Sequence, residues 1–321
     1  MVELEQRMNV LLDQEQRSYG VGDYIGEQRK KTRTANLSNA SEMVTEVWRD
    51  KMCNWFYEVT THFEYHADVA AMAVSHFDRY LSKKLPSMNG IMAKKHFHLA
   101  AMTCLYLAIK VSDRKTCLSM AAMVKVDQQN YEEKDMVDME MDVLSTLGWR
   151  VNGPTPYSFC IHFSSLISST ILPRLDRKVL LKNCLSLTED AVCTYNVGTK
   201  HPSSVGLACL LLALENEALP CGSKTRDELM SRIKDLSLHD AEVGECYRQL
   251  EEVYREKTTP SPVTFSPPIS PTSAVTTAKP IVSLLASQIK SVIDCEFLMV
   301  SSPTGATDQS LLLCGQSQQF L

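Results

Sequence analysis

The sequence of 321 residues predicts an all-α protein with two tandem five-helix domains and a disordered C-terminal tail. Apolar residues recur at helical spacings of three and four along most of residues 43–256. No useful stretch of this range alternates like a β-strand, and each half contains one nearly all-apolar helical segment. We therefore predict an N-terminal arm at 1–42, helical domains at 43–152 and 153–256, and a tail at 257–321.

The polar N-terminal arm carries a cluster of basic side chains: Arg29, Lys30, Lys31 and Arg33. Clusters of this kind serve as nuclear-localisation signals, but a charged run is as often a solvated segment. Both interpretations of the arm remain open.

The first domain contains five predicted helices around a central third one. They are expected at 48–63, 73–80, 99–109, 118–124 and 134–147. The third, "LAAMTCLYLAI", is apolar nearly all round, so we expect the other helices to wrap it. Gly148 is placed to end the fifth helix as a C-terminal cap.

The second domain repeats this order after the turn-rich junction "NGPTP" at 152–156. Its helices are expected at 157–168, 176–195, 202–216, 225–236 and 239–256. The segment "CLYLA" at 104–108 recurs as "CLLLA" at 209–213, each time in the third helix of its set. A tandem duplication explains the shared segment together with the shared helix order.

Four charged residues lie on helical stripes that otherwise face the core. Asp78 shares a stripe with apolar neighbours of the second helix, and Arg49 does so in the first. Because an unpaired buried charge costs several kcal/mol, on the order of its desolvation penalty, we predict that these two pair inside the domain. Glu140 and Lys110 pose the same problem, with two interpretations left open: a second internal salt bridge, or a charged rim that awaits a partner protein.

Composition excludes several classes of protein. The net charge of −5 provides no broad basic field for nucleic acid. No apolar run approaches the ~20 residues of a membrane span, and "MVELEQRMNV" lacks the apolar core of a signal peptide. The eleven cysteines are scattered without CxxC or CxxH pairs, which is typical of reduced core thiols. We expect a protein of the nucleus and cytoplasm with no nucleic-acid or membrane partner.

The tail at 257–321 is rich in Pro, Ser and Thr and is predicted to be disordered, with one transient helix at 281–300. It contains five Ser/Thr-Pro dipeptides that are candidate phosphorylation sites: Thr259, Ser261, Ser266, Ser270 and Ser302. We expect the tail to regulate the protein without contributing to the fold.

Four ordered segments of the helical region resemble the successive helices of the cyclin box. They are "WRDKMCNWFYEV" at 48–59, "HFDRYLS" at 76–82, "LYLAIKVSD" at 105–113 and "MEMDVLSTLGWRVNGPTPYSF" at 139–159. The resemblance covers about residues 42–250 and is strongest to cell-cycle cyclins, particularly D-type and algal ones. It implies two stacked cyclin folds that bind and activate a cyclin-dependent kinase.

The resemblance also implies roles for individual residues. Lys110 and Glu140 match residues that contact the kinase, and Arg49 and Asp78 match a pair inside the first box. The family docks substrate or inhibitor peptides on the first helix of that box, where the matching residues are Trp48, Met52, Trp55 and Glu58. Lys51 stands there in place of an aliphatic residue, and we expect it to disfavour the basic peptides that the family docks.

Two other classes of function find little support. The sequence has no Gly-rich phosphate loop, no HExxH, no GxSxG and no histidine cluster, so we expect neither an enzyme nor a cofactor or metal site. A transcription-factor adaptor with the same duplicated fold would need a basic face and usually a zinc ribbon. The alternative that remains is a cyclin-like interaction scaffold that does not activate a kinase.

Overall fold

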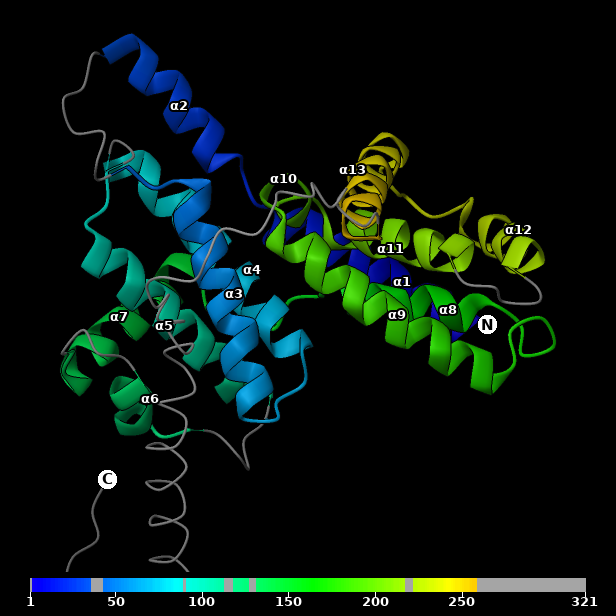
Figure 1. The fold of residues 1–321 in the computed structure, drawn as a ribbon, viewed down its shortest axis with the longest axis horizontal. Coiled ribbons are helices and arrows are strands. Elements are labelled where there is room, and N and C mark those ends of the chain that lie inside the picture. Colours follow the sequence, from blue (N-terminus) through cyan, green and yellow to red (C-terminus); the bar gives the residue numbers. More distant parts are fainter. Residues whose placement is uncertain are drawn as a thin grey trace, which may run out of the picture. The chain divides into compact units, whose positions relative to one another are not determined.

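The computed structural model describes residues 2–35, 43–88, 91–112, 118–126, 131–216 and 222–258 (Figure 1). The chain divides into two compact units, residues 1–278 and 279–321, and every described residue belongs to the first unit. Within the described ranges the secondary structure is helical apart from turns and one isolated bridge between Met43 and Ile91. The predicted all-α fold is confirmed for this part of the chain, while the tail and its candidate phosphorylation sites from Thr259 onward lie outside the described residues.

Five helices form a first set around a buried central helix. They are α3 (Glu46–His62), α4 (Asp68–Lys84), α5 (Lys94–Ser112), α6 (Met120–Val126) and α7 (Glu133–Leu147). The central helix α5 packs against the other four, and every residue from 99 to 109 is buried. Burial on all sides requires a helix that is apolar all round, which is what this segment is.

The ends of these helices follow from local chemistry. The Thr45 hydroxyl accepts a hydrogen bond from the Trp48 amide at 3.3 Å and so satisfies a donor at the start of α3. Gly148 ends α7 with φ +62°, a left-handed conformation that costs glycine little because it has no Cβ. The predicted cap at this residue is confirmed.

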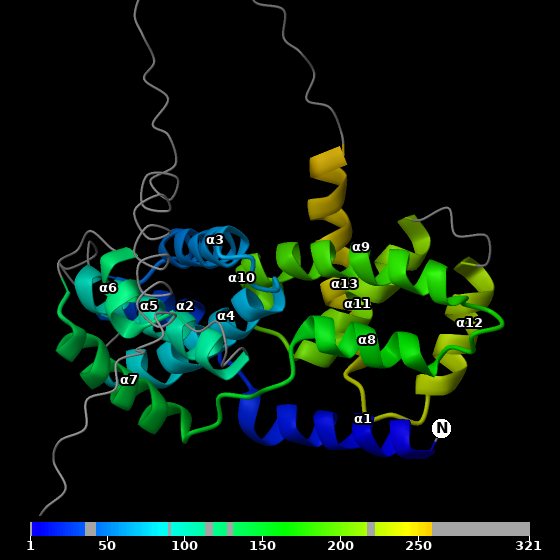
Figure 2. The ribbon, with the colours of Figure 1, turned by 90° about the horizontal axis from the view of Figure 1, so that it is seen from below.

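A second set of helices surrounds α11 in the same way (Figure 2). Its members are α8 (Pro156–Leu166), α9 (Arg174–Cys193), the short α10 (Tyr195–Gly198), α11 (Pro202–Asn216), α12 (Gly222–Ile233) and α13 (Asp240–Thr258). All five residues of "CLLLA" at 209–213 are buried in α11, as are those of "CLYLA" in α5. The two related segments therefore occupy equivalent central positions.

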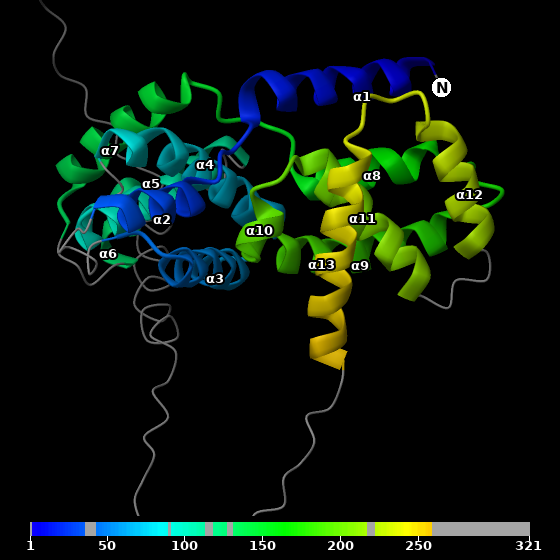
Figure 3. The same ribbon diagram turned by 90° about the horizontal axis from the view of Figure 1, so that it is seen from above.

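The described part of the N-terminal arm is helical, and its first helix is partly buried. It contains α1 (Val2–Gln14), a π-helical turn (Glu15–Tyr19) and α2 (Tyr24–Ala35). In Figures 2 and 3, α1 runs alongside α8, and its Met8 and Leu12 side chains are buried in the core of the second set. The apolar side chains of α1 thus cover a core that is formed by residues 159–250. In the basic cluster, Arg29 and Lys30 are exposed, while the side chains of Lys31 and Arg33 lie outside the described part of the chain, so both interpretations of the cluster stay predictions.

Two further features concern the described residues alone. The seven cysteines within them are free, and all except the partly exposed Cys193 are buried. None of the helices described here is both long enough and apolar enough to cross a membrane.

The burial of α1 leads to a testable prediction. Met8→Ala and Leu12→Ala should each lower the free energy of unfolding by about 2–5 kcal/mol, the usual cost of removing a buried aliphatic side chain. Val10→Ala is the matched control, because Val10 lies on the same helix and is 55% exposed. Urea unfolding followed by circular dichroism measures all three. Equal stability of the Leu12→Ala and Val10→Ala proteins would show that α1 does not belong to the core.

Candidate functional site

A buried ion pair joins α3 to α4. The Arg49 guanidinium donates from Nε to Asp78 Oδ1 at 2.9 Å and from Nη2 to Asp78 Oδ2 at 2.8 Å, and the two side chains are 0% and 1% exposed. Burial by itself disfavours a charged guanidinium, but the Asp78 carboxylate outweighs this and holds the pKa of Arg49 above its ordinary value. The pair is therefore a fixed, charged element of the core.

The same guanidinium also reaches the second set of helices. Nη1 donates to the Cys193 carbonyl at 3.0 Å, and Nη2 donates to the Val192 carbonyl at 2.9 Å. These carbonyls belong to the last turn of α9, where backbone acceptors lack partners within the helix and a cation is favoured. Arg49 thus caps α9 from the other set of helices.

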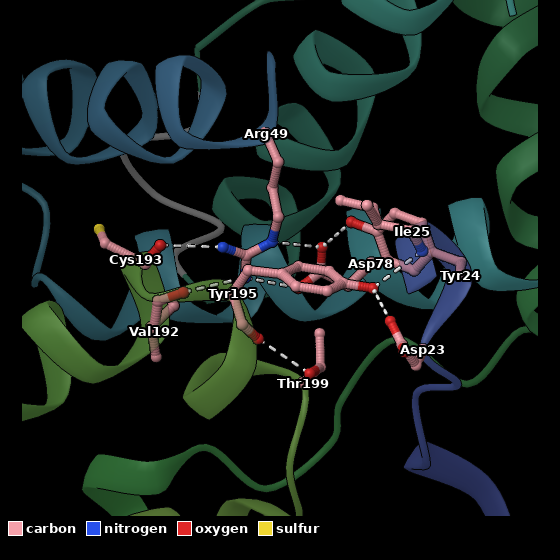
Figure 4. A network of polar contacts seen from close by, with 9 residues as sticks. All are labelled: Asp23, Tyr24, Ile25, Arg49, Asp78, Val192, Cys193, Tyr195 and Thr199. Atoms are coloured by element: carbon pink, nitrogen blue, oxygen red, sulfur yellow. Dashed lines mark hydrogen bonds and ion pairs between the residues drawn. The ribbon is translucent and has the colours of Figure 1, made fainter. Parts of the chain in front are cut away.

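Two tyrosines extend this network to the N-terminal segment (Figure 4). The Tyr24 hydroxyl donates to Asp78 Oδ1 at 2.8 Å, while the Tyr195 hydroxyl accepts from the Ile25 amide and donates to Asp23 Oδ1, both at 3.0 Å. Burial and the Asp78 carboxylate raise the pKa of Tyr24 well above its ordinary value, so that its hydroxyl stays a donor. We name Arg49, Asp78, Tyr24 and Tyr195 the central network.

Close packing leaves no room for another side chain at one point of this network. A Cβ atom on Gly198 would lie 2.5 Å from the Val192 carbonyl oxygen and 3.0 Å from Arg49 Nη2. The guanidinium also lies over the Tyr195 ring, 5.5 Å from its centroid. Glycine in α10 therefore allows the last turn of α9, the cation and the aromatic ring to meet.

The structure brings together the pair that the sequence predicts and adds partners that the sequence does not indicate. The Tyr24 and Tyr195 positions carry no motif, and the two carbonyl acceptors of α9 are backbone atoms that any residue supplies. The one available signal is general: a buried guanidinium has five N–H groups, and a single carboxylate cannot accept from all of them.

Lys110 and Glu140 meet at the surface of the first set. Lys110 Nζ, near the C-terminal end of α5, lies 2.6 Å from Glu140 Oε1 on α7 and 5.3 Å from the centroid of the Tyr106 ring. The Lys110 side chain is 50% exposed and that of Glu140 is 12% exposed. The two residues form an ion pair, as in the first interpretation, and they also lie at a rim, as in the second. An ion pair with half of one partner in water contributes little to stability, typically 0–1 kcal/mol.

Exposed apolar side chains accompany this pair on α7. Val137 precedes Glu140 by one helical turn, Met141 follows it directly, and both side chains are exposed. Trp149, two residues after the end of α7, is exposed as well. Protein interfaces are enriched in methionine and aromatic side chains, so the exposed Met141 near the pair favours a contact with another protein at this face. The helical period places Val137 on one apolar stripe with Glu140, Leu144 and Leu147, and its exposure corrects that expectation. The sequence pattern gave no indication that Met141 and Trp149 are exposed.

The predicted docking residues share the outer side of α3. Trp48, Met52 and Trp55 are partly exposed, and Glu58 and Lys51 are exposed. The buried side of the helix is formed by Arg49, Cys53, Phe56, Tyr57, Val59 and Thr60. The Trp48 ring makes an edge contact with the Phe97 ring, with 5.4 Å between the ring centroids. Lys94 Nζ lies 5.3 Å from the centroid of the Trp48 ring. The structure therefore presents these side chains on one accessible face with a lysine among them.

Possible metal ligands are scattered among the residues that the structure describes. Within those ranges no group of three or more His, Cys, Asp or Glu side chains could hold a metal ion.

Comparison with known proteins identifies related sequences. The family model for the N-terminal domain of cyclins matches residues 22–152. Cyclin-D3-3 of Arabidopsis thaliana is 27% identical over 200 residues, which cover 62% of this chain and 53% of the relative. Cyclin-G1 of Mus musculus is 29% identical over 162 residues, which cover 50% of this chain and 52% of the relative. The chain thus spans about half the length of the curated relatives it matches.

Solved structures share the fold. A viral cyclin from herpesvirus saimiri superimposes with a TM-score of 0.54 at 19% identity, covering 67% of this chain and 87% of the viral one. At this level of identity, the likeness establishes the arrangement of helices and nothing about activity.

The central network predicts that breaking a buried ion pair costs more stability than breaking a partly exposed one. Asp78→Ala should lower the free energy of unfolding by about 3–5 kcal/mol, because it leaves Arg49 charged and buried without its counter-ion. Lys84→Ala breaks the pair between Lys84 of α4 and Asp142 of α7, whose side chains are 30% and 35% exposed, and should lower the free energy of unfolding by about 1 kcal/mol or less. Urea unfolding provides the comparison. If the two substitutions cost the same, the buried pair is not the constraint described here.

Proposed function

Because this chain belongs to the cyclin family, with the N-terminal cyclin domain at residues 22–152, we propose that it is a regulatory subunit that binds and activates a cyclin-dependent protein kinase in the cell cycle. In this proposal the chain supplies no catalytic group of its own. Residues 43–152 and 153–256 act as its two helical repeats, and the protein works in the nucleus and cytoplasm.

The observation that carries the proposal is the Lys110–Glu140 pair at the surface of the first set. A kinase that approaches this face meets a cation and a carboxylate that are already desolvated on one side. Charge-assisted hydrogen bonds from such groups to kinase backbone or side chains are stronger than those between neutral groups. Val137 and Met141 add apolar area at the same place.

Activation then follows from preferential binding. A regulatory subunit shifts a kinase toward its active conformation only by binding that conformation more tightly than the inactive one. A rigid binding face favours this selection, since a face that adapted to both conformations would bind both. The central network supports the proposal because it anchors α3 and α4 to each other. Both helices pack against α5, and α5 also packs against α7.

The outer side of α3 completes the proposal as a docking surface for substrate or inhibitor peptides. Trp48, Met52 and Trp55 offer aromatic and apolar contacts, and Glu58 offers a charge. Lys51 places a cation beside them. Its positive charge repels basic peptides, which are the peptides that related proteins dock. We therefore propose that this surface recruits basic peptides more weakly than the matching surface of related cyclins does, or prefers other peptides.

The alternative is a cyclin-like scaffold that binds partners without activating a kinase. Both proposals use the same fold and the same surfaces. They differ in one observable property, which is whether a purified partner kinase gains activity when the chain is added.

The proposal predicts separate effects on kinase binding and on folding. Lys110→Ala and Glu140→Ala should each weaken kinase binding by about 2–5 kcal/mol, the usual loss when one member of a buried interfacial charge pair is removed. Both proteins should stay folded, because in the free chain the pair lies at the surface. The kinase captured by the wild-type protein from synchronised cells is purified, and its affinity and activity on a Ser-Pro peptide are measured with each variant.

Asp227→Ala is the control, because Asp227 is an exposed acid on α12, away from the helices that carry the pair. It should leave binding unchanged. The interface assignment fails if Lys110→Ala and Glu140→Ala activate the kinase as well as the wild type does, or if they lower the melting temperature as much as Asp78→Ala does.

A further inference from the structure

The first half of α9 carries an exposed apolar pair that the kinase interface does not use. Leu175 is 73% exposed and Val179 is 42% exposed. They are four residues apart on one helix, so their side chains are neighbours on its surface. Single exposed aliphatic residues are common, but an adjacent pair beside a hollow is typical of a surface that binds another molecule.

A groove of about 700 Å³ lies at this pair. Tyr157 of α8 and the α9 residues Leu181 and Leu185 line it together with Leu175 and Val179. The lining is therefore mainly aliphatic and aromatic, which suits apolar side chains of a bound molecule.

Three cations border the groove in a row. Arg174, Lys178 and Lys182 line it, are all exposed and recur every four residues, so they follow one side of α9. Across the described ranges, no carboxylate forms an ion pair with any of the three. Arg177 lines the groove too, but its Nη2 is engaged with the carbonyls of Ile167 and Leu172. The groove thus presents positive charge that the chain itself does not neutralise.

This groove is separate from the surfaces described above. The last turn of α9 contacts Arg49, while the groove extends from Arg174 to Leu185, so its near end lies roughly 12 Å and its far end roughly 28 Å from that contact along the helix. The Lys110–Glu140 pair belongs to α5 and α7 of the first set. A partner could therefore occupy the groove independently of the kinase interface.

We propose that this groove on α9 is a second docking site, and that it binds a peptide segment in which aliphatic side chains are flanked by Asp or Glu. Leu175 and Val179 contact the aliphatic side chains, while Arg174, Lys178 and Lys182 face the carboxylates. Charge complementarity of this kind selects the partner and speeds its association. Nucleic acid suits the groove less well, because the centre of the surface is aliphatic and the whole chain carries a net charge of −5.

The test is a selection followed by a comparison of variants. A random library of displayed peptides, each about 12 residues long, is selected on the full-length chain. Enriched peptides should combine acidic and aliphatic residues. Their affinities, measured by fluorescence anisotropy, should fall about tenfold or more when Lys178→Glu is combined with Lys182→Glu, and about tenfold when Leu175→Ala is combined with Val179→Ala. Added salt should weaken binding to the wild type.

The matched control is Lys224→Glu combined with Lys234→Glu, which makes the same charge change at exposed positions of the second set. It should leave peptide affinity unchanged. Circular dichroism checks the fold of each variant. If one of the two groove variants is unfolded, the peptide affinity of the other one decides the outcome. Kinase binding is measured alongside and should be unaffected by both groove variants, so that failure of this site and failure of the proposed function are distinguishable.

Three results would overturn the docking site. The first is an absence of enriched peptides that depend on the groove residues. The second is enrichment of peptides without acidic residues. The third is tighter binding of single-stranded DNA or of phosphatidylserine vesicles through the same lysines, which would assign the surface to nucleic acid or to a membrane.

Discussion

The buried guanidinium of Arg49 is the constraint on which the rest of the structure depends. A charge with no contact to water must find acceptors for its N–H groups, and four of the hydrogen bonds are supplied by Asp78, Val192 and Cys193. Those acceptors come from α4 and from the last turn of α9, so the charge can be satisfied only when the two sets of helices meet. Removing one member of such a network lowers the free energy of unfolding by more than the whole network contributes to it, because the charge left behind is still buried.

The network and the surface pair illustrate two uses of the same chemistry. Arg49 and Asp78 are fixed, because neither can exchange its partner for water. Lys110 is half exposed and can exchange Glu140 for a group on another protein at little cost in stability. The proposed selection of one kinase conformation needs both a framework that does not adapt and surface charges that can rearrange.

Much of the helical framework could be predicted because its residues repeat with the period of a helix. The helix expected at 239–256 is observed at Asp240–Thr258, and the Arg49–Asp78 pair follows from two charges on apolar stripes. Leu4, Met8, Leu11 and Leu12 recur at helical spacing, but which core they cover could not be predicted, because that core is built from residues 159–250. The hydrogen bonds from Arg49 to α9 could not be predicted either, because every residue has a backbone carbonyl and the sequence does not distinguish one from another.

Hydrogen exchange in the wild-type and Asp78→Asn proteins tests the central claim most directly. Asparagine keeps the shape of the side chain at this position but removes its charge. If the network joins the N-terminal segment and both sets of helices, amide exchange should become faster in α2 and α10 as well as in α3 and α4. Faster exchange confined to α3 and α4 would contradict the account and would show that the two sets of helices are held together by other contacts.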